Sequence, residues 1–365
     1  MQPAAGRIQA VYLWLVLALT AACAQGAPSS SSGAPPAPPA ATSAAPAVGA
    51  AGTSPTAAPV AVERLRVPYV AVSVTQLPAW VAQEAGTFAR EGLEVSLEYI
   101  PTGSTLVQAM VAGEAHFGIA GSEAPISASL NGADLLILAP TVDHLLFTIY
   151  TRPDLTDAAA MRGQRLGITR VGSSTDFAAR QWVQSLGLRP GDDVTLVQAG
   201  GQPEILTALQ AGAIDAGVLS PPSDIQARRA GLRELADLGR LEVPFYQSSV
   251  LTTRKMVDER PDLVRRFVRA IVAANAVIHE DKALTKQAIA RYSQTTDDEV
   301  LEASYQAADP AIPRVPLPTR AAIESAIELV ALTDPAARGA DPARFYDPRF
   351  VKELEDSGFI QGLYR

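Results

Sequence analysis

Hydroxyl and amide side chains gather where predicted strands of this chain give way to predicted helices. In open α/β sheets, ligands bind beyond the carboxyl ends of the strands, so these joins are where a binding site is expected. Hydroxyls and free backbone N–H groups at helix starts suit an anion or a polar oxygen. The candidate ligand-binding residues at these joins are Thr75, Gln76, Thr102, Gly103, Ser104, Ser122, Glu123, Ser173, Ser174, Thr175 and Ser220.

Two of these serines fit a structural role equally well. Ser104 and Ser173 each stand at an expected helix start, where a serine side chain caps the free backbone N–H groups. Asp176 follows Ser173 at the spacing of a capping box. Capping and ligand contact are compatible, because a capping residue can also face a cleft.

Three further residues complete the candidate set, each with an ordinary alternative. Trp80 could form an aromatic wall of the site or pack the first helix. Arg170 could pair with a carboxylate or sulfonate of a ligand or face solvent. His144 lies in a segment expected to join two lobes, where it could reach ligand or pack as a hydrogen-bonded histidine.

Glu123 bears most directly on the kind of ligand. A carboxylate at a cleft-facing helix start repels nitrate, sulfonate or phosphate and accepts hydrogen bonds from an amino group. The alternative is favourable placement in the first helical turn, facing solvent. We therefore expect a small organic ligand that carries a donor group rather than a bare inorganic anion.

Composition excludes several classes of function. The sequence contains no nucleophile elbow, P-loop or dinucleotide fingerprint. A single cysteine excludes an intramolecular disulfide and Cys-rich zinc or iron–sulfur sites, and the three histidines lack HExxH spacing. The net charge of −8 argues against nucleic acid, whose binders need a basic surface. We expect no catalytic residue, no metal and no cofactor.

Strands and helices alternate from residue 65 onward, which is typical of βαβ units and a doubly wound, mostly parallel sheet. Strands are expected over 65–73, 93–100, 116–120 and 135–139, and helices over 78–90, 104–112 and 123–130. The fold class is therefore α/β.

The same series recurs at a constant offset of 99 residues. Segment 95–97 matches 194–196, 109–113 matches 208–212, 117–120 matches 216–219, and Gly132 matches Gly231. Four matches in register predict two lobes built on one plan. Generic α/β segments that share a helix-stop glycine are the alternative, and they too imply two lobes.

Two apolar, β-rich stretches, 141–151 and 244–253, are expected to join the lobes. The chain would then form lobe 1 over 63–145, form lobe 2 over 146–245 and return to lobe 1 over 246–365. Beyond residue 254 the pattern is helical, with a long amphipathic helix from Pro261. Further helices are expected over 281–292, 296–306, 319–332 and 347–356.

The N-terminal sequence predicts an export signal followed by a tether. Residues 1–22 combine one basic residue, Arg7, with an apolar run that is too short to span a membrane, which is typical of a signal peptide. Cys23 ends a stretch that resembles the bacterial lipobox, which implies lipidation at Cys23; ordinary cleavage and release is the alternative. Residues 23–62 are rich in Ala, Pro and Ser and should stay disordered and extended.

Several short segments carry a family resemblance, namely 78–82, 86–88, 91–95, 113–118, 121–125, 166–168, 172–174, 211–216 and 260–264. Together they resemble the periplasmic solute-binding proteins of ABC importers, of the nitrate/sulfonate/taurine type that includes binders of thiamine-precursor pyrimidines. His116 departs from the acidic residue usual at its position in that family.

The resemblance implies a two-lobed type II periplasmic-binding-protein fold, hinged by two crossover segments. It also implies an exported, monomeric protein, periplasmic or at the cell surface, that closes over a small solute and delivers it to an ABC permease with its ATPase. Two alternatives stay open: an enzyme on the same scaffold, of the pyrimidine or menaquinone pathway type, and a tethered sensory binding module.

Overall fold

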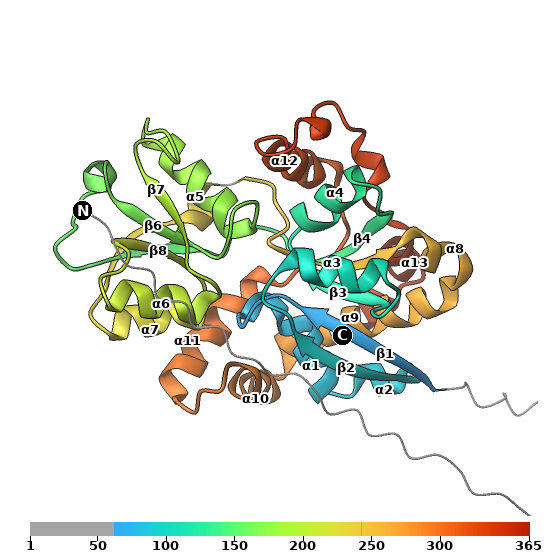
Figure 1. Ribbon diagram of the computed structural model, residues 1–365. Helices are drawn as coiled ribbons and strands as arrows, with labels where there is room; N and C mark the ends of the chain where they lie inside the picture. The colour runs from blue at the N-terminus through green and yellow to red at the C-terminus, as the bar shows by residue number, and fades with distance from the viewer. Residues whose placement is uncertain (1–61, 242) are drawn as a thin grey trace, which may run out of the picture. The chain divides into compact units, whose positions relative to one another are not determined.

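The computed structural model describes residues 62–241 and 243–365 (Figure 1). The predicted signal peptide, Cys23 and all but the last residue of the predicted tether lie outside the described residues. Within the described part of the chain, no helix combines the length and the apolar character needed to cross a bilayer.

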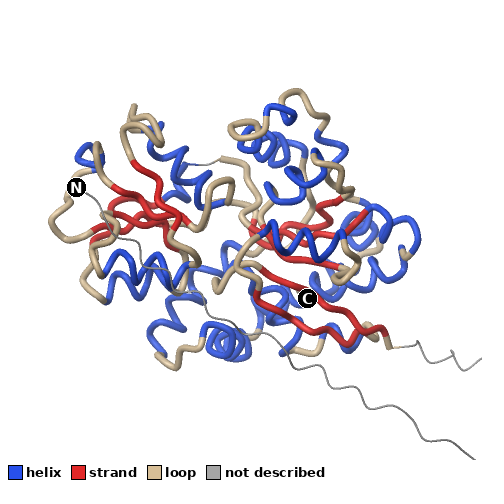
Figure 2. The backbone as a smooth tube through the Cα atoms, in the orientation of Figure 1, coloured by secondary structure: helices blue, strands red, loops and turns tan. Residues whose placement is uncertain are grey.

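Two five-stranded mixed sheets organise the described chain (Figure 2). The first has the order β2-β1-β3-β10-β4, with β1 Glu63–Tyr69, β2 Leu93–Tyr99, β3 Phe117–Ala120, β4 Leu135–Val142 and β10 Ser248–Thr253. The second has the order β7-β6-β8-β5-β9, with β5 Thr148–Thr151, β6 Arg165–Ile168, β7 Thr195–Gln198, β8 Ala216–Leu219 and β9 Arg233–Asp237.

Each sheet is parallel except for one inserted strand. In the first sheet β10 runs antiparallel to both β3 and β4, and in the second β5 runs antiparallel to both β8 and β9. The inserted strands are those that adjoin the two crossings of the chain between the sheets. The predicted α/β class with two mostly parallel sheets is confirmed.

The internal repeat is also confirmed. Helices α3 (Gly103–Val111) and α6 (Gln202–Gln210) begin 99 residues apart, as do β3 and β8. Gly113 and Gly212 follow these helices with φ of 78° and 71°, a left-handed conformation that glycine adopts without steric cost and that ends a helix. The two sheets also share one strand order.

The prediction of a single helix over 78–90 is wrong, because this segment is not one continuous helix. It is divided into α1 (Leu77–Glu84) and α2 (Thr87–Arg90), preceded by the 3₁₀ turn Val74–Gln76. The division falls at Gly86, whose φ of 69° lies in the left-handed region and is incompatible with a continuous helix. The first strand also ends earlier than expected, at Tyr69.

The remaining helices surround the sheets (Figure 1). Those between strands are α4 Glu123–Leu130, α5 Ser174–Ser185 and α7 Ser223–Arg229. The C-terminal part contains α8 Arg254–Glu259, α9 Pro261–Glu280, α10 Lys282–Ser293, α11 Asp298–Ala308, α12 Arg320–Val330, α13 Arg349–Asp356 and α14 Phe359–Leu363. Sequence patterning missed the short helix α14, which is not long enough to show a clear period.

The apolar stripe of α9 is buried, as its spacing predicts. Phe267 is fully buried and stacks on Phe117, with 3.9 Å between ring centroids, and on Phe88, with 5.3 Å. These contacts join α9 to β3 and to α2, so one helix from the end of the chain holds together elements from its beginning.

Replacing this central ring should destabilise the fold strongly. Phe267→Ala leaves a cavity between two aromatic rings, and such changes cost about 3–5 kcal/mol of unfolding free energy. The measurement is urea unfolding followed by circular dichroism. Val111→Ala, at a side chain that is 59% exposed, is the control and should change little. A loss below about 1 kcal/mol for Phe267→Ala would show that this stack is not central to the core.

Candidate functional site

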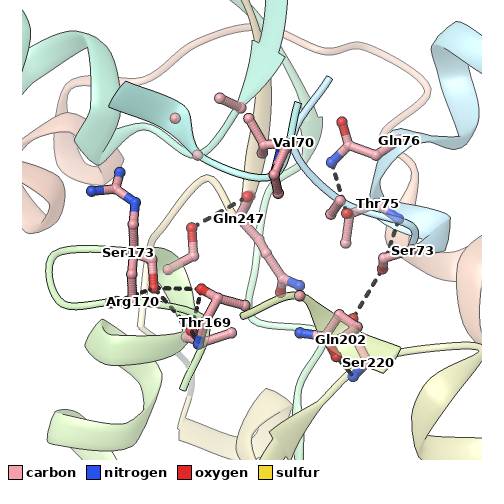
Figure 3. Close-up of a pocket in the computed structure, with 18 of the residues that line it drawn as sticks. Val70, Ser73, Thr75, Gln76, Thr169, Arg170, Ser173, Gln202, Ser220 and Gln247 are labelled. Atoms are coloured by element: carbon pink, nitrogen blue, oxygen red, sulfur yellow. Dashed lines mark hydrogen bonds between the residues drawn. The ribbon is translucent and has the colours of Figure 1, made fainter. Parts of the chain in front are cut away.

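A small cavity lies where helices of the two lobes begin opposite one another (Figure 3). Its volume is about 70 Å³, and we call it the inner cavity. The first lobe and its return segment contribute Val70, Ala71, Ser73, Thr75, Gln76, Pro101, Gly103, Ala120, Gly121, Glu123 and Gln247. The segment after β4 and the second lobe contribute Phe147, Thr169, Arg170, Ser173, Ser174, Thr175, Gly201, Gln202 and Ser220.

Most of the residues singled out from the sequence meet at this cavity although they are far apart in the chain. They are Thr75, Gln76, Gly103, Glu123, Arg170, Ser173, Ser174, Thr175 and Ser220. All of them follow a strand or begin a helix, which is the placement the strand–helix alternation predicts.

Five candidates lie elsewhere. Trp80 is fully buried in the core and stacks on Tyr292 at 5.1 Å between ring centroids, so it packs α1 and forms no wall of the cavity. Thr102 caps α3, its Oγ1 accepting a hydrogen bond from the Thr105 backbone N–H at 3.2 Å. The exposed Ser104 begins the same helix but faces away from the inner cavity.

Ser122 and His144 are likewise held by other partners. The buried Ser122 hydroxyl donates to the backbone carbonyl of Tyr246 at 3.2 Å. His144 lies after β4, where its Nδ1 is 2.9 Å from a carboxylate oxygen of the neighbouring Asp143. It lines a separate shallow pocket and does not reach the inner cavity.

The candidate set omits four polar residues of the cavity, Ser73, Thr169, Gln202 and Gln247. The repeat could have found two of them. Thr169 stands 99 residues after Val70, and Gln202 stands 99 residues after Gly103, and both of those positions also line the cavity. Gln247 lies in the crossing before β10, which has no counterpart at that offset, so no signal in the sequence marks it.

Hydrogen bonds close the cavity between the lobes. Ser73 Oγ lies 3.0 Å from Ser220 Oγ (Figure 3). The Val74 backbone N–H donates to the Pro221 carbonyl at 3.0 Å. At the outer edge, Arg229 of α7 pairs with Asp297 at the start of α11. These two parts of the chain are therefore in direct contact across the cavity.

Hydrogen bonds at the start of α5 hold in place the part of the cavity wall that the second lobe contributes. Ser173 Oγ accepts from the Asp176 backbone N–H at 3.3 Å, while the Asp176 carboxylate accepts from the Gly172 N–H at 2.8 Å. Thr175 Oγ1 accepts from the Thr169 N–H at 2.9 Å. Ser173 thus caps the helix, as one of the two roles considered for it requires, and it also lines the cavity. Contact with a ligand stays a prediction.

Glu123 spans the two lobes. Its side chain is only 5% exposed, and both carboxylate oxygens accept hydrogen bonds from the Ser174 hydroxyl, at 3.1 and 3.2 Å. Burial raises the pKa of Glu123 to about 7, although the Ser174 hydrogen bond and the nearby Arg170 charge act in the opposite direction. At neutral pH this carboxyl can therefore either accept or donate a hydrogen bond.

Gly121 provides the space for that carboxyl. A Cβ at this position would overlap both the Glu123 carboxylate and the Ser174 hydroxyl. The glycine therefore allows two side-chain ends to approach closely, and a side chain at this position would displace them.

Arg170 is the cationic group of the cavity. It is half-buried, and within the described residues no carboxylate oxygen lies within 4.0 Å of its guanidinium. One guanidinium nitrogen lies 3.4 Å from where a Cβ would stand on Gly103, so the side chain reaches across to the start of α3. A charged group without an ion-pair partner is well suited to bind a polar or anionic group of a ligand.

The cavity is small and its lining is mixed. Hydroxyl and amide side chains line it beside apolar groups such as Val70, Pro101 and Phe147, together with one guanidinium and one carboxyl whose pKa burial raises to about 7. Within the described ranges no three His, Cys, Asp or Glu side chains group closely enough to hold a metal ion. The arrangement offers hydrogen-bond donors and acceptors to a small polar molecule.

Filling the space at Gly121 should displace Glu123. In Gly121→Ala we expect the carboxyl to move into solvent and its pKa to fall from about 7 toward the ordinary 4.5. Carbon-13 NMR titration of labelled glutamate carboxyl groups measures this directly. Gly362→Ala, where a Cβ meets no atom within 4 Å, is the matched control. A Glu123 pKa that stays near 7 in Gly121→Ala would contradict this assignment of the carboxyl to the cavity wall.

The comparisons with known proteins agree with this architecture. A family model described as NMT1/THI5 like matches residues 74–283, more than half of the chain. A protein of Brachyspira hyodysenteriae named as an ABC transporter periplasmic binding protein is 22% identical over 228 residues, which is 58% of this chain. The match spans 65% of that relative, slightly less than two thirds of its length.

Two solved structures show the same fold. The alkanesulfonate-binding protein SsuA from Xanthomonas axonopodis pv. citri, bound to MOPS, aligns with a TM-score of 0.65 at 20% identity, covering 76% of this chain and 94% of that one. The periplasmic nitrate-binding protein NrtA from Synechocystis PCC 6803 aligns with a TM-score of 0.67 at 14% identity, covering 81% and 89%. With the periplasmic-binding-protein fold and a matching family model over most of both lobes, the chain belongs to the NMT1/THI5-like family.

Proposed function

We propose that this protein is the substrate-binding component of an ABC importer. It captures a small organic solute between its lobes by hinge closure and delivers the closed complex to a membrane permease with its ATPase. The observation that carries the proposal is the inner cavity, because its walls come from both lobes and meet through Ser73–Ser220 and Glu123–Ser174.

The mechanism requires only binding and a change in population between open and closed forms. A solute that contacts both lobes stabilises the closed form by its differential affinity for it. The two chain crossings, between β4 and β5 and between β9 and β10, serve as the hinge. With this hinge we propose the division of the chain into 63–145, 146–245 and 246–365.

In the proposed complex the ligand contacts the candidate residues that line the inner cavity. It also contacts Thr169, Gln202 and Gln247. Hydroxyls and amides hydrogen-bond the polar atoms of the solute, Arg170 faces an electron-rich group, and Glu123 faces a hydrogen-bonding group. The donor-bearing ligand expected from the sequence fits Glu123 in its ionised form.

The location of the protein forms part of the same proposal. An exported protein with a signal peptide at 1–22, lipidated at Cys23 and tethered by 23–62, would work as a monomer at the periplasmic or outer side of a membrane. The names of the relatives, an ABC transporter periplasmic binding protein and binding proteins for alkanesulfonate and nitrate, support transport over catalysis.

Native mass spectrometry of the full secreted chain tests the proposed function. Purified from its own cells without denaturation, the protein should carry a small organic molecule in a one-to-one complex. Arg170→Ala should lose that molecule, since it removes the guanidinium of the cavity, whereas Arg64→Ala, which alters an exposed ion pair with Glu94, should retain it. Release of a chemically altered product during incubation would instead favour an enzyme on this scaffold.

Glu123 should make solute affinity depend on pH. In an open cleft the carboxyl faces water and keeps a pKa near 4.5, and closure raises it to about 7. Because the closed form binds the proton more tightly, affinity for a neutral solute should rise as pH falls from 7 to 4.5, by up to about a hundredfold.

Titration calorimetry at pH 5, 6, 7 and 8 measures that slope. In Glu123→Gln, which cannot ionise, the slope should disappear and the affinity at pH 8 should approach that of the native protein at low pH. A solute with an ammonium group would reverse the slope, because its charge favours the ionised carboxylate. Equal slopes in the native and Glu123→Gln proteins would contradict the role given to this residue.

A further inference from the structure

The two chain crossings, between β4 and β5 and between β9 and β10, are hydrogen-bonded to each other. The Leu238 backbone N–H in the second crossing donates to the Phe147 carbonyl in the first, at 2.9 Å. The Leu146 backbone N–H in the first crossing donates to the side-chain oxygen Oε1 of Gln247, the last residue of the second. A side chain therefore forms one of the links between the segments that serve as the hinge.

The backbone beside Gln247 is fixed to the first lobe. The carbonyl of the preceding Tyr246 accepts hydrogen bonds from the Ser122 backbone N–H at 3.1 Å and from the Ser122 hydroxyl at 3.2 Å. The Tyr246 hydroxyl donates to Thr319 Oγ1 at 2.9 Å. Bonds at the starts of α4 and α12 thus hold this strand end, so the Gln247 side chain projects from a fixed point.

The Leu146 N–H determines which way the Gln247 amide faces. A backbone N–H can only donate, so the side-chain atom opposite it must be the amide oxygen. The amide nitrogen Nε2 is then the group left over, and no acceptor among the described residues lies within hydrogen-bond distance of it. Gln247 is 6% exposed and lines the inner cavity (Figure 3). Its Nε2 is therefore a donor that a solute in the cavity can use.

Gln202 provides a matched amide in the second lobe. It is 4% exposed and lines the same cavity, and its Oε1 accepts from the Ser220 backbone N–H at 2.9 Å. Both partners of that bond belong to the second lobe, on α6 and directly after β8. The two amides offer the same chemistry to a solute, but of the two only Gln247 also bonds a hinge segment.

We propose that Gln247 is the positioning residue that couples the inner cavity to the hinge. A solute atom that accepts from Nε2 fixes the plane of the amide, and the plane fixes Oε1 because both atoms belong to one rigid group. Oε1 holds Leu146 and, through the next residue, Phe147, the start of β5 in the second lobe. Occupancy of the cavity then favours the hinge geometry in which this bond is intact. This inference rests on the proposed function and adds the contact through which the solute acts on the hinge.

Amide exchange at Leu146 tests the hinge end of the coupling. The full chain, labelled with nitrogen-15 leucine, is dialysed to remove bound molecules, and exchange of this N–H with deuterium is followed by NMR. Gln247→Leu removes the acceptor and should speed the exchange about tenfold. Gln202→Leu is the matched control and should change it less than about twofold. Leu251, buried in β10, should stay protected in both variants and reports that the fold is intact.

Gln247→Glu separates the cavity end from the hinge end. At pH 8 its carboxylate still accepts from Leu146 but has no N–H to donate to a solute. Leu146 exchange in the dialysed variant should therefore remain within about twofold of the native rate. Native mass spectrometry of the variant as purified should show retention of the co-purified molecule reduced about fivefold or more, as it should for Gln202→Leu. A purely structural role for Gln247 predicts full retention in Gln247→Glu.

The coupling itself is measured in the native protein. Leu146 exchange should be slower by about threefold or more in the protein as purified, with its bound molecule, than in the same protein after dialysis. Equal rates in these two samples would overturn the coupling.

The other outcomes distinguish this inference from the proposed function. Equal Leu146 exchange in the dialysed native and Gln247→Leu proteins would overturn the hinge link, and full retention of the molecule by Gln247→Glu would overturn the cavity contact. Either result leaves the binding function intact. Purification of the native protein without any bound molecule would count against the proposed function and against this inference with it.

Discussion

The contact between the two lobes depends on one interaction, in which the buried Glu123 carboxyl accepts a hydrogen bond from Ser174. Glu123 belongs to the first lobe, Ser174 belongs to the second, and the space for both exists because residue 121 is glycine. A buried carboxylate is unfavourable unless it is hydrogen-bonded or protonated. Contact between the lobes is therefore coupled to the protonation and hydrogen bonding of one side chain in the wall of the inner cavity.

The scaffold explains how two lobes can meet so closely around a small volume. Each sheet presents the carboxyl ends of its parallel strands to the cleft, and the helices that follow begin there. Because the second lobe repeats the plan of the first, equivalent positions line both walls, such as Val70 with Thr169 and Gly121 with Ser220. The inserted strands β5 and β10 tie each sheet to the chain crossings, which serve as the hinge in the proposed closure.

Local sequence patterns predicted the elements and most of the cavity wall. Strand–helix joins were visible as changes of hydrophobic period, and Gly113 and Gly212 marked helix ends that the structure confirms. The break at Gly86 was overlooked because the apolar pattern continues across it, while the backbone conformation of that glycine does not. Trp80 looked like a site residue because it follows a join, but its ring turns inward to Tyr292.

What the sequence could not provide was information on tertiary contacts. Glu123 and Ser174 are 51 residues apart, and their hydrogen bond exists because two lobes approach each other, which no local pattern encodes. Gln247 enters the cavity from a crossing segment outside the repeat. Ser104, whose position at a strand–helix join suggested the inner cavity, lies outside it.

Lobe closure around a solute is the central claim, and a distance measurement across the cleft tests it most directly. Spin labels on α7 and α11, introduced at cysteines in a Cys23→Ser background, report the separation of the helices that Arg229 and Asp297 join in the closed form. The account predicts a short, narrow distance distribution for the protein with its co-purified solute and a longer one after the solute is removed. A single distribution that does not change on removal of the solute would contradict it.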